Sequence, residues 1–406
     1  MSWKHIPLSE VADFSNGINF DKSAYSSGVK LIGVSNFGNR FSPDYDELQE
    51  VNSQVVRQND YLKNGDIVFV RSNGNKELVG RCMLIKDPPY SITYSGFCIR
   101  ARLKDTNEYD HVFFTYYFKS NAFRKALAGN AIGANIQNLS QGRLANHIAN
   151  IPCIDTQRKI ACVLSAYDDL IENNQNQIKL LEEAAQRLYK EWFVDLRFPG
   201  HENTPIVEGV PEGWHVSVIG NICDAVGGGT PSTKIDEYYR DGKIKWVTPT
   251  DITRNSSLIL LDTEKHITDE GLHNSSAKML PPYTILMTSR ASVGYFGLCE
   301  HPVCTNQGFI SCIPHDEKTC FYLLYNLMYR VEEIRGKATG STFLEITKKN
   351  FRELPILIPD TSILRQFNEV LTPIIKQMEV LTKAIKMLQE ARDRLLPKLM
   401  NGEIEV

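Results

Sequence analysis

The sequence predicts an α+β protein built from two similar mixed α/β domains and two long helices that pack together as a coiled coil. Three observations predict this fold. An internal repeat covers nearly the whole chain of 406 residues, two stretches carry an apolar residue at every third or fourth position, and β-rich runs fill the segments between them. A chain of this length is expected to form two or three domains.

The repeat is visible first at the N-terminus, where Trp3–Asp13 aligns with Trp214–Asp224 at an offset of 211 residues. Later matches drift between offsets of 207 and 218, as small loop insertions would require. The further aligned segments are Ile32–Phe37 with Val247–Ile252, Leu62–Phe69 with Leu280–Met287, Gly96-Phe97 with Gly308-Phe309, and Ile151-Pro152 with Ile358-Pro359.

After each Ile-Pro pair the offset becomes constant at 207, and apolar residues recur with a 4-3 spacing. This 3.5-residue period is the signature of a left-handed coiled coil. The predicted seam consists of Ile160, Leu164, Ile171, Asn174, Ile178, Leu181 and Leu188 in the first stretch and of Phe367, Leu371, Met378, Leu381, Ile385, Leu388 and Leu395 in the second. Asn174 is either a residue that fixes the register or a tolerated defect. Pro373 should kink the second helix, and Pro397 should end its regular part.

The pattern divides the chain into five segments. They are a first domain at 1–154, a first helix at 155–198, a linker at 199–213, a second domain at 214–359 and a second helix at 360–406. Each domain has short β-rich runs, then a helical stretch (111–127 and 319–334), and then a glycine loop with a short helix.

Charge and composition exclude some classes of function but do not identify one. The net charge is −3; residues 1–150 carry a net +3 and residues 201–359 a net −4, so neither half has the excess of a strong non-specific DNA binder. The nine cysteines include no CxxC pair, and the Cys and His residues between Cys299 and Cys320 match no zinc spacing. We expect buried free thiols, no metal site, no membrane span and a cytoplasmic location.

Taken together, these features resemble the specificity subunits of type I restriction-modification enzymes. The residues that carry the resemblance are the paired Trp3 and Trp214 starts, Arg71-Ser72-Asn73-Gly74, Ser289-Arg290-Ala291-Ser292, Thr339-Gly340-Ser341-Thr342, and the Ile-Pro junctions with Gln157-Arg158 and Arg365-Gln366 behind them. The resemblance spans nearly the full chain. No single motif is specific, whereas their order and duplication are.

The resemblance implies two target-recognition domains held apart by antiparallel helices and related by a pseudo-two-fold axis. It implies a non-catalytic subunit that recognises a bipartite, asymmetric site in double-stranded DNA, with helices that set the spacing of the two half-sites. Adenine methylation and restriction would come from two modification subunits and from restriction subunits. S-adenosylmethionine, ATP and Mg would bind to those partners, and no cofactor to this chain.

Base reading requires Arg or Lys for guanine and Asn or Gln for adenine, presented on loops that reach a groove. The candidate DNA-binding residues of the first domain are Arg71, Asn73, Lys76, Arg81, Asn135, Gln137 and Arg143. Those of the second are Arg254, Asn255, Arg290, Ser341, Thr342, Lys348 and Lys349. No catalytic residue is expected.

The sequence is compatible with two alternative functions. Asp87-Pro88-Pro89-Tyr90 spells the DPPY box of adenine-N6 DNA methyltransferases, in which the aromatic ring stacks on a flipped base. No glycine-rich strand-turn-helix accompanies it, and a Pro-Pro turn explains the string better. The second alternative is a coiled-coil scaffold protein that joins two protein-binding domains and reads no DNA sequence.

Overall fold

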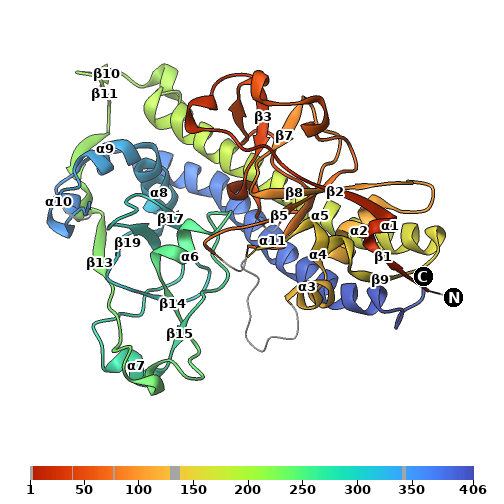
Figure 1. Ribbon diagram of the computed structural model, residues 1–406. Coiled ribbons are helices and arrows are strands. Elements are labelled where there is room, and N and C mark those ends of the chain that lie inside the picture. The colour runs from red at the N-terminus through yellow and green to blue at the C-terminus, as the bar shows by residue number, and fades with distance from the viewer. Residues whose placement is uncertain (1–2, 39, 76–77, 129–137, 341–343) are drawn as a thin grey trace. The chain divides into compact units, whose positions relative to one another are not determined.

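The computed structural model describes residues 3–38, 40–75, 78–128, 138–340 and 344–406 (Figure 1). The chain divides into two compact units. Unit 1 contains residues 1–171 and 387–406, and unit 2 contains residues 172–386. Among the described residues, no helix combines the length and apolar character needed to cross a bilayer.

The described residues of unit 1 form three small sheets and four short α-helices. Its sheets have the strand orders β1-β9, β2-β8-β5-β6 and β4-β3-β7. The strands are β1 (Lys4–Pro7), β2 (Ala12–Asn16), β3 (Val29–Ile32), β4 (Gln49–Val51), β5 (Ile67–Val70), β6 (Cys82–Leu84), β7 (Ile92–Tyr94), β8 (Cys98–Leu103) and β9 (Ile148–Ile151). The helices that follow α1 (Leu8–Val11) are α2 (His111–Lys119), α3 (Asn121–Ala128) and α4 (Gln141–Ala145).

Two segments of unit 1 are each divided. The helical stretch at 111–127 breaks at Ser120, whose N–H bonds to the end of α2 while its hydroxyl accepts from Phe123 N–H in the first turn of α3. The β-rich run at 92–102 is two strands, because residues 95–97 form a turn between β7 and β8. This turn carries part of the candidate site.

Unit 2 repeats the same architecture with different side chains. Its corresponding sheets have the orders β12-β20, β13-β19-β16-β17 and β15-β14-β18. The strands are β12 (His215–Val218), β13 (Cys223–Gly227), β14 (Ile244–Val247), β15 (His266–Ile267), β16 (Ile285–Thr288), β17 (Phe296–Gly297), β18 (Cys304–Thr305), β19 (Phe309–Pro314) and β20 (Pro355–Ile358). The short helices are α6 (Pro249–Thr253), α7 (Asp269–His273), α8 (Cys320–Tyr329), α9 (Val331–Gly336) and α10 (Lys348–Arg352). A separate hairpin pairs β10 (Ile206–Val207) with β11 (Val210–Pro211).

Strand pairing confirms the repeat and corrects one of its matches. Lys4 pairs with Ile151 and His215 with Ile358, which reproduces the offsets of 211 and 207. Ile99 pairs with Asn16, and Ile310 with Gly227, so the offset through β8 and β19 is 211. The alignment of Gly96-Phe97 with Gly308-Phe309 is therefore wrong by one residue: Phe97 is equivalent to Gly308.

The two long helices are α5 (Ile154–Tyr189), extended by a π-helical turn at Lys190–Val194, and α11 (Thr361–Met400). The helical conformation of α11 continues through Pro373 and Pro397, so Pro397 does not end it. Asp360 caps α11, since its carboxylate accepts from Ser362 N–H at 2.8 Å. The predicted seam residues are all buried or half-buried in the structure.

Within each unit the two helices run antiparallel. In unit 1, Asp168 pairs with Arg392, whereas the earlier Lys159 donates to Val406, beyond the end of α11. In unit 2, Phe367 near the start of α11 packs against Tyr189 and Phe193 from the end of α5, with ring centroids 6.4 and 4.8 Å away.

A polar contact in unit 1 has an apolar counterpart in unit 2. Asp168 accepts from the Tyr116 hydroxyl with one carboxylate oxygen and pairs with Arg392 through the other. Adding 207 to Asp168 gives Ile375, and subtracting 207 from Arg392 gives Ala185; both are buried. Tyr325, on α8 of unit 2, has a buried hydroxyl without a hydrogen-bond partner among the described residues.

Candidate nucleic-acid interface

Four short loops meet in unit 1 and form what we call cluster 1: residues 17–19, 71–73, 95–97 and 138–139. Backbone hydrogen bonds join them. Ile18 N–H donates to Tyr94 O at 2.9 Å, Arg71 N–H to Phe97 O at 2.8 Å, and Leu139 N–H to Arg71 O at 2.8 Å. The loops are therefore fixed to one another by groups that every residue except proline carries.

Unit 2 has the equivalent cluster 2, made of residues 228–230, 289–291, 306–308 and 345–346. Gly229 N–H donates to Thr305 O at 2.9 Å, Ser289 N–H to Gly308 O at 2.8 Å, and Ile346 N–H to Ser289 O at 3.0 Å. Each bond is the counterpart of one in cluster 1 at the offset of its own strand. The scaffold of the two clusters is the same, although almost every side chain on it differs.

In both clusters a glycine stands where the first loop lies closest to the backbone at the end of β7 or β18. A Cβ atom on Gly17 would overlap the carbonyl oxygens of Tyr94 and Ser95, and one on Gly228 would overlap those of Thr305 and Asn306. These glycines let the first loop lie directly against the turn that follows β7 or β18.

The side chains at the tips of the clusters are chemically different. Cluster 1 presents Arg71, Asn73 and Phe97, and Phe97 is 61% exposed. Cluster 2 presents the exposed side chains of Thr230, Arg290 and Gln307. Both sets suit contact with DNA bases, through hydrogen bonds or, for Phe97, through apolar contact.

The candidate residues of the first domain fall on and around cluster 1. Arg71 is half-buried and its guanidinium donates to Gly96 O at 3.2 Å, while Asn73 Oδ1 accepts from Asn75 N–H at 2.7 Å. Arg81 lies just before β6 and is half-buried, and Arg143 is exposed on α4. Lys76, Asn135 and Gln137 lie outside the described residues.

Two candidates of the second domain, Arg254 and Asn255, follow α6. Arg254 is exposed, 3.9 Å from Glu264. Asn255 has a structural use, because its amide nitrogen donates to Ser257 O and Ile259 O and closes its own loop. This use competes with the bidentate geometry that adenine recognition needs.

The other candidates of the second domain lie closer to cluster 2. Arg290 is half-exposed and stands 3.9 Å from Glu345. Lys348 and Lys349 are exposed in the first turn of α10, which Thr347 caps. Ser341 and Thr342 lie outside the described residues.

A cationic hollow of about 470 Å³ adjoins cluster 2. Lys278, Lys348 and Arg352 line it together with the end of β13, and Asp224 is the acidic residue at its edge. Arg352 donates to Ala225 O at 3.0 Å, and the Lys348 ammonium lies over Gly227. Such a group of cations fits a DNA phosphate.

The three cations of the hollow have no basic counterparts in unit 1, where Lys278 corresponds to Asp60 at the offset of 218. At the offset of 207, Lys348 corresponds to Gln141 and Arg352 to Ala145. The local charge beside the clusters therefore differs in sense from the net charge of the domains. Cluster 2 has the cationic hollow, although the second domain is the acidic one overall. The sequence reading missed Lys278 and Arg352. The four-residue spacing of Lys348 and Arg352 on one helix face was the available signal.

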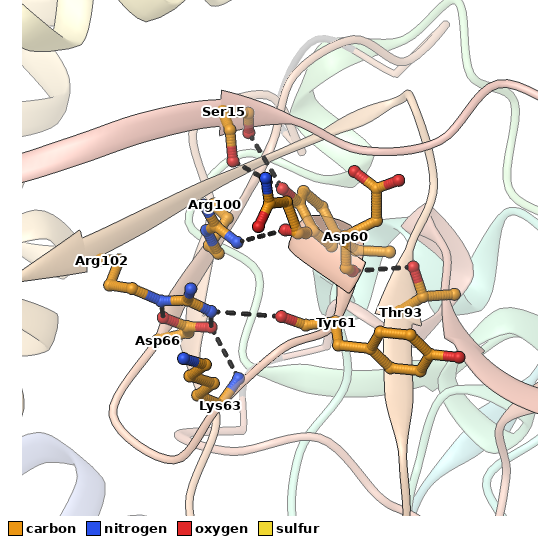
Figure 2. A network of polar contacts seen from close by, with 10 residues as sticks. Ser15, Asp60, Tyr61, Lys63, Asp66, Thr93, Arg100 and Arg102 are labelled. Carbon is orange, nitrogen blue, oxygen red and sulfur yellow. Dashed lines mark hydrogen bonds and ion pairs between the residues drawn. The ribbon is translucent and has the colours of Figure 1, made fainter. Parts of the chain in front are cut away.

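Part of the basic excess of the first domain is internal. Figure 2 shows Arg102 bonded to both oxygens of Asp66, at 2.7 and 2.6 Å, and to Tyr61 O. The buried Asp66 also accepts from Lys63 N–H, and Arg100 donates to Asn59 O. The Asp66 carboxylate raises the pKa of Arg102. These arginines hold the segment before β5 against β8 and are not DNA-facing charges.

The DPPY string forms an exposed turn between β6 and β7. Asp87 has a positive φ of 43°, and its N–H donates to Asn64 Oδ1 at 3.0 Å. The Tyr90 ring packs edge-on against Tyr45 and lies under the Lys30 ammonium. The tetrapeptide is thus used as a turn.

The cysteines near the end of unit 2 are free thiols, as expected. Cys299, Cys304, Cys312 and Cys320 are buried, and burial raises the pKa of Cys299 and of Cys304 to about 12. Among the described residues, no group of three or more His, Cys, Asp or Glu side chains is placed to hold a metal ion.

The fold and the two clusters define a protein with two related domains that present similar backbones and different exposed side chains. The family described as the type I restriction modification DNA specificity domain matches residues 1–183 and 211–390. The chain belongs to this family, and it is a DNA sequence-specificity subunit of the type I restriction-modification class.

Relatives agree with this assignment, and a solved structure agrees with the fold. The HindI specificity subunit of Haemophilus influenzae is 23% identical over 476 residues, which covers 99% of this chain and 99% of that protein. The MjaIX specificity subunit of Methanocaldococcus jannaschii is 34% identical over 183 residues, which covers 43% of this chain and 42% of that protein. The crystal structure of a type I S subunit from M. genitalium has the same fold, with a TM-score of 0.56 and 18% identity over 98% of this chain and 96% of that one.

Proposed function

We propose that this chain reads a DNA site made of two separated and different parts, one at cluster 1 and one at cluster 2, and that it contributes no catalytic group. Methylation of an adenine in the site and restriction of unmodified DNA would be carried out by modification and restriction subunits. S-adenosylmethionine, ATP and Mg would bind to those subunits.

The observation that carries the proposal is the contrast between a shared backbone and divergent tips. The hydrogen bonds that fix cluster 1 recur in cluster 2, whereas Arg71, Asn73 and Phe97 are replaced by Ser289, Ala291 and Gly308. A scaffold that is kept while its exposed residues change is suited to presenting different donors and acceptors to different base pairs. Two such scaffolds in one chain favour a split site with unlike halves.

Dependence on partners follows from the charge. The chain carries a net −3, and phosphate contacts supply much of the affinity of DNA-binding proteins. The cationic hollow beside cluster 2 is a local exception and does not make the chain basic. Modification subunits bound to the chain would supply the remaining phosphate contacts.

The test is to express the chain with its modification subunits in a host that lacks other adenine methylation, and to map methylated adenines across the genome. We expect a single split motif with two different halves. A continuous motif, or a palindromic one with identical halves, would contradict the proposal. Binding of S-adenosylmethionine to the isolated chain would instead support the methyltransferase alternative.

A further inference from the structure

Phe97 occupies the tip of the turn between β7 and β8 and is 61% exposed. The backbone around it is firmly held. Arg71 N–H and Ser72 N–H both donate to Phe97 O, at 2.8 and 3.4 Å, and Phe97 N–H donates to Ser95 Oγ at 3.3 Å. The ring therefore projects from a fixed turn.

Hydrogen-bonding groups surround this aromatic tip. The Arg71 guanidinium donates to Gly96 O, in the residue directly before Phe97, and Asn19 lies so close to Gly96 that a Cβ there would overlap its amide. Protein-binding sites usually show contiguous apolar patches of several hundred Å². One rigid ring among donors and acceptors fits a nucleic-acid base instead, because a base has both polar edges and apolar surface.

The equivalent position in unit 2 excludes such a ring. Phe97 corresponds to Gly308, where a Cβ would stand 2.9 Å from Pro249 Cγ and 3.1 Å from Asn306 Oδ1. The exposed side chain next to it is Gln307, and the Thr230 hydroxyl donates to the Gln307 side-chain oxygen. The two clusters thus present an apolar and a polar group at neighbouring places on one scaffold.

We propose that Phe97 is a specificity-determining residue of the half-site read by cluster 1, where its ring contacts the apolar surface of a base. That surface is a thymine 5-methyl group or the face of an unstacked base. The inference rests on the proposed function. It assigns an apolar contact to one half-site and a polar contact, through Gln307, to the other.

The experiment uses the full chain with its modification subunits and DNA duplexes that contain the mapped motif. Each base pair of the motif is replaced in turn, and methylation rates are compared for the wild type, Phe97→Ala, Gln307→Ala and Ile148→Ala. Ile148 is the matched control, because it is an apolar side chain of the same unit, 56% exposed on β9. A second series replaces thymine by uracil, which removes only the 5-methyl group.

We expect Phe97→Ala to slow methylation of the intact motif roughly tenfold, the equivalent of about 1.4 kcal/mol. We also expect it to lose discrimination at one or two adjacent positions of one half-site. Gln307→Ala should act on the opposite half-site, and Ile148→Ala should match the wild type. If the wild type but not Phe97→Ala is slowed by uracil, the contact is with the thymine methyl group. If both are insensitive to uracil while Phe97→Ala still loses discrimination, the ring contacts the face of a base.

The inference is overturned if Phe97→Ala has the rates and base preferences of Ile148→Ala. It is also overturned if Phe97→Ala and Gln307→Ala act on the same half-site. Removal of an exposed ring should leave thermal unfolding unchanged, which separates a DNA effect from a folding effect. A wild-type complex that modifies no split motif would refute the proposed function itself, which is a different result.

Discussion

Tyr116 and Tyr325 offer a paired test of what the polar contact between α5 and α11 contributes to stability. The Tyr116 hydroxyl donates to Asp168, which also pairs with Arg392, and the side chains of the two charged residues are 15% and 19% exposed. Burial, followed by the charge of Asp168, raises the pKa of Tyr116. In unit 2 the two equivalent positions on the long helices hold Ile375 and Ala185, and the Tyr325 hydroxyl has no partner among the described residues.

Loss of the hydroxyl should therefore destabilise unit 1 at Tyr116 but should not destabilise unit 2 at Tyr325. A hydrogen bond to a charged group contributes about 1.5–3 kcal/mol, and a buried hydroxyl without a partner costs about 1–3 kcal/mol. Tyr116→Phe should lower the stability of unit 1 by about 2 kcal/mol, which corresponds to a fall of about 4–8 °C in its unfolding midpoint. Tyr325→Phe should leave the midpoint of unit 2 unchanged or raise it.

Scanning calorimetry of the full chain measures both midpoints, and hydrogen exchange at α2 and α8 assigns each change to its unit. The triple variant Tyr116→Phe, Asp168→Ile, Arg392→Ala places the helix residues of unit 2 at positions 168 and 392. It should recover most of the stability that Tyr116→Phe loses, because no polar group is then left unpaired. Equal shifts for Tyr116→Phe and Tyr325→Phe would refute the reasoning.

Four further predictions concern the site, the helices and pH. Arg290→Ala should weaken specific DNA binding by about 1–3 kcal/mol if Arg290 reads a guanine, and unchanged base preference in a competition assay would remove it from the candidates. Lys348→Gln, which introduces the residue found at the equivalent position 141 of unit 1, should weaken binding to all DNA sequences alike. The slope of log affinity against log salt concentration should become less steep by about 0.9, and an unchanged slope would mean that Lys348 contacts no phosphate. A seven-residue insertion in both α5 and α11 adds about 10.5 Å to each helix. It should lengthen the spacer of the methylated motif by about three base pairs, and an unchanged spacer would contradict the hypothesis that the helices set the spacing of the half-sites. Burial raises the pKa of Glu182 above 4.5, although a hydrogen bond from Leu258 N–H opposes the shift. Just above pH 4.5 the folded chain therefore keeps a proton that the unfolded chain loses, and the stability of the fold falls as pH rises through the raised pKa of Glu182. Glu182→Gln should remove that part of the fall in urea unfolding measured at several pH values, and an unchanged pH dependence would exclude Glu182 as its source.

Much of the fold could be predicted because it leaves a periodic trace in the sequence. The 4-3 spacing from Ile160 to Leu188 and its copy from Phe367 to Leu395 are imposed by helix geometry, and every one of these residues is buried or half-buried. The end of α11 was harder to predict, because tertiary packing of Leu399 and Met400 in the core of unit 1 keeps the helix intact beyond Pro397.

The site was less predictable because it depends on register rather than on composition. Aligning Gly96 with Gly308 placed Phe97 opposite Phe309, which is buried. Strand pairing moves it by one position, which is enough to turn a side chain from the interior to the surface. The spacing of Lys348 and Arg352 could reveal one side of the cationic hollow, whereas Lys278 joins them only through tertiary packing.

The division of α11 between the units has a consequence for biosynthesis. Leu395, Leu399 and Met400 complete the hydrophobic core of unit 1, yet the ribosome makes them after all of unit 2. The first domain to emerge is thus the last to finish folding, and until then its open core must be tolerated or shielded by chaperones. A premature stop codon shortly before residue 387 would spare the chain's later domain and damage its earlier one.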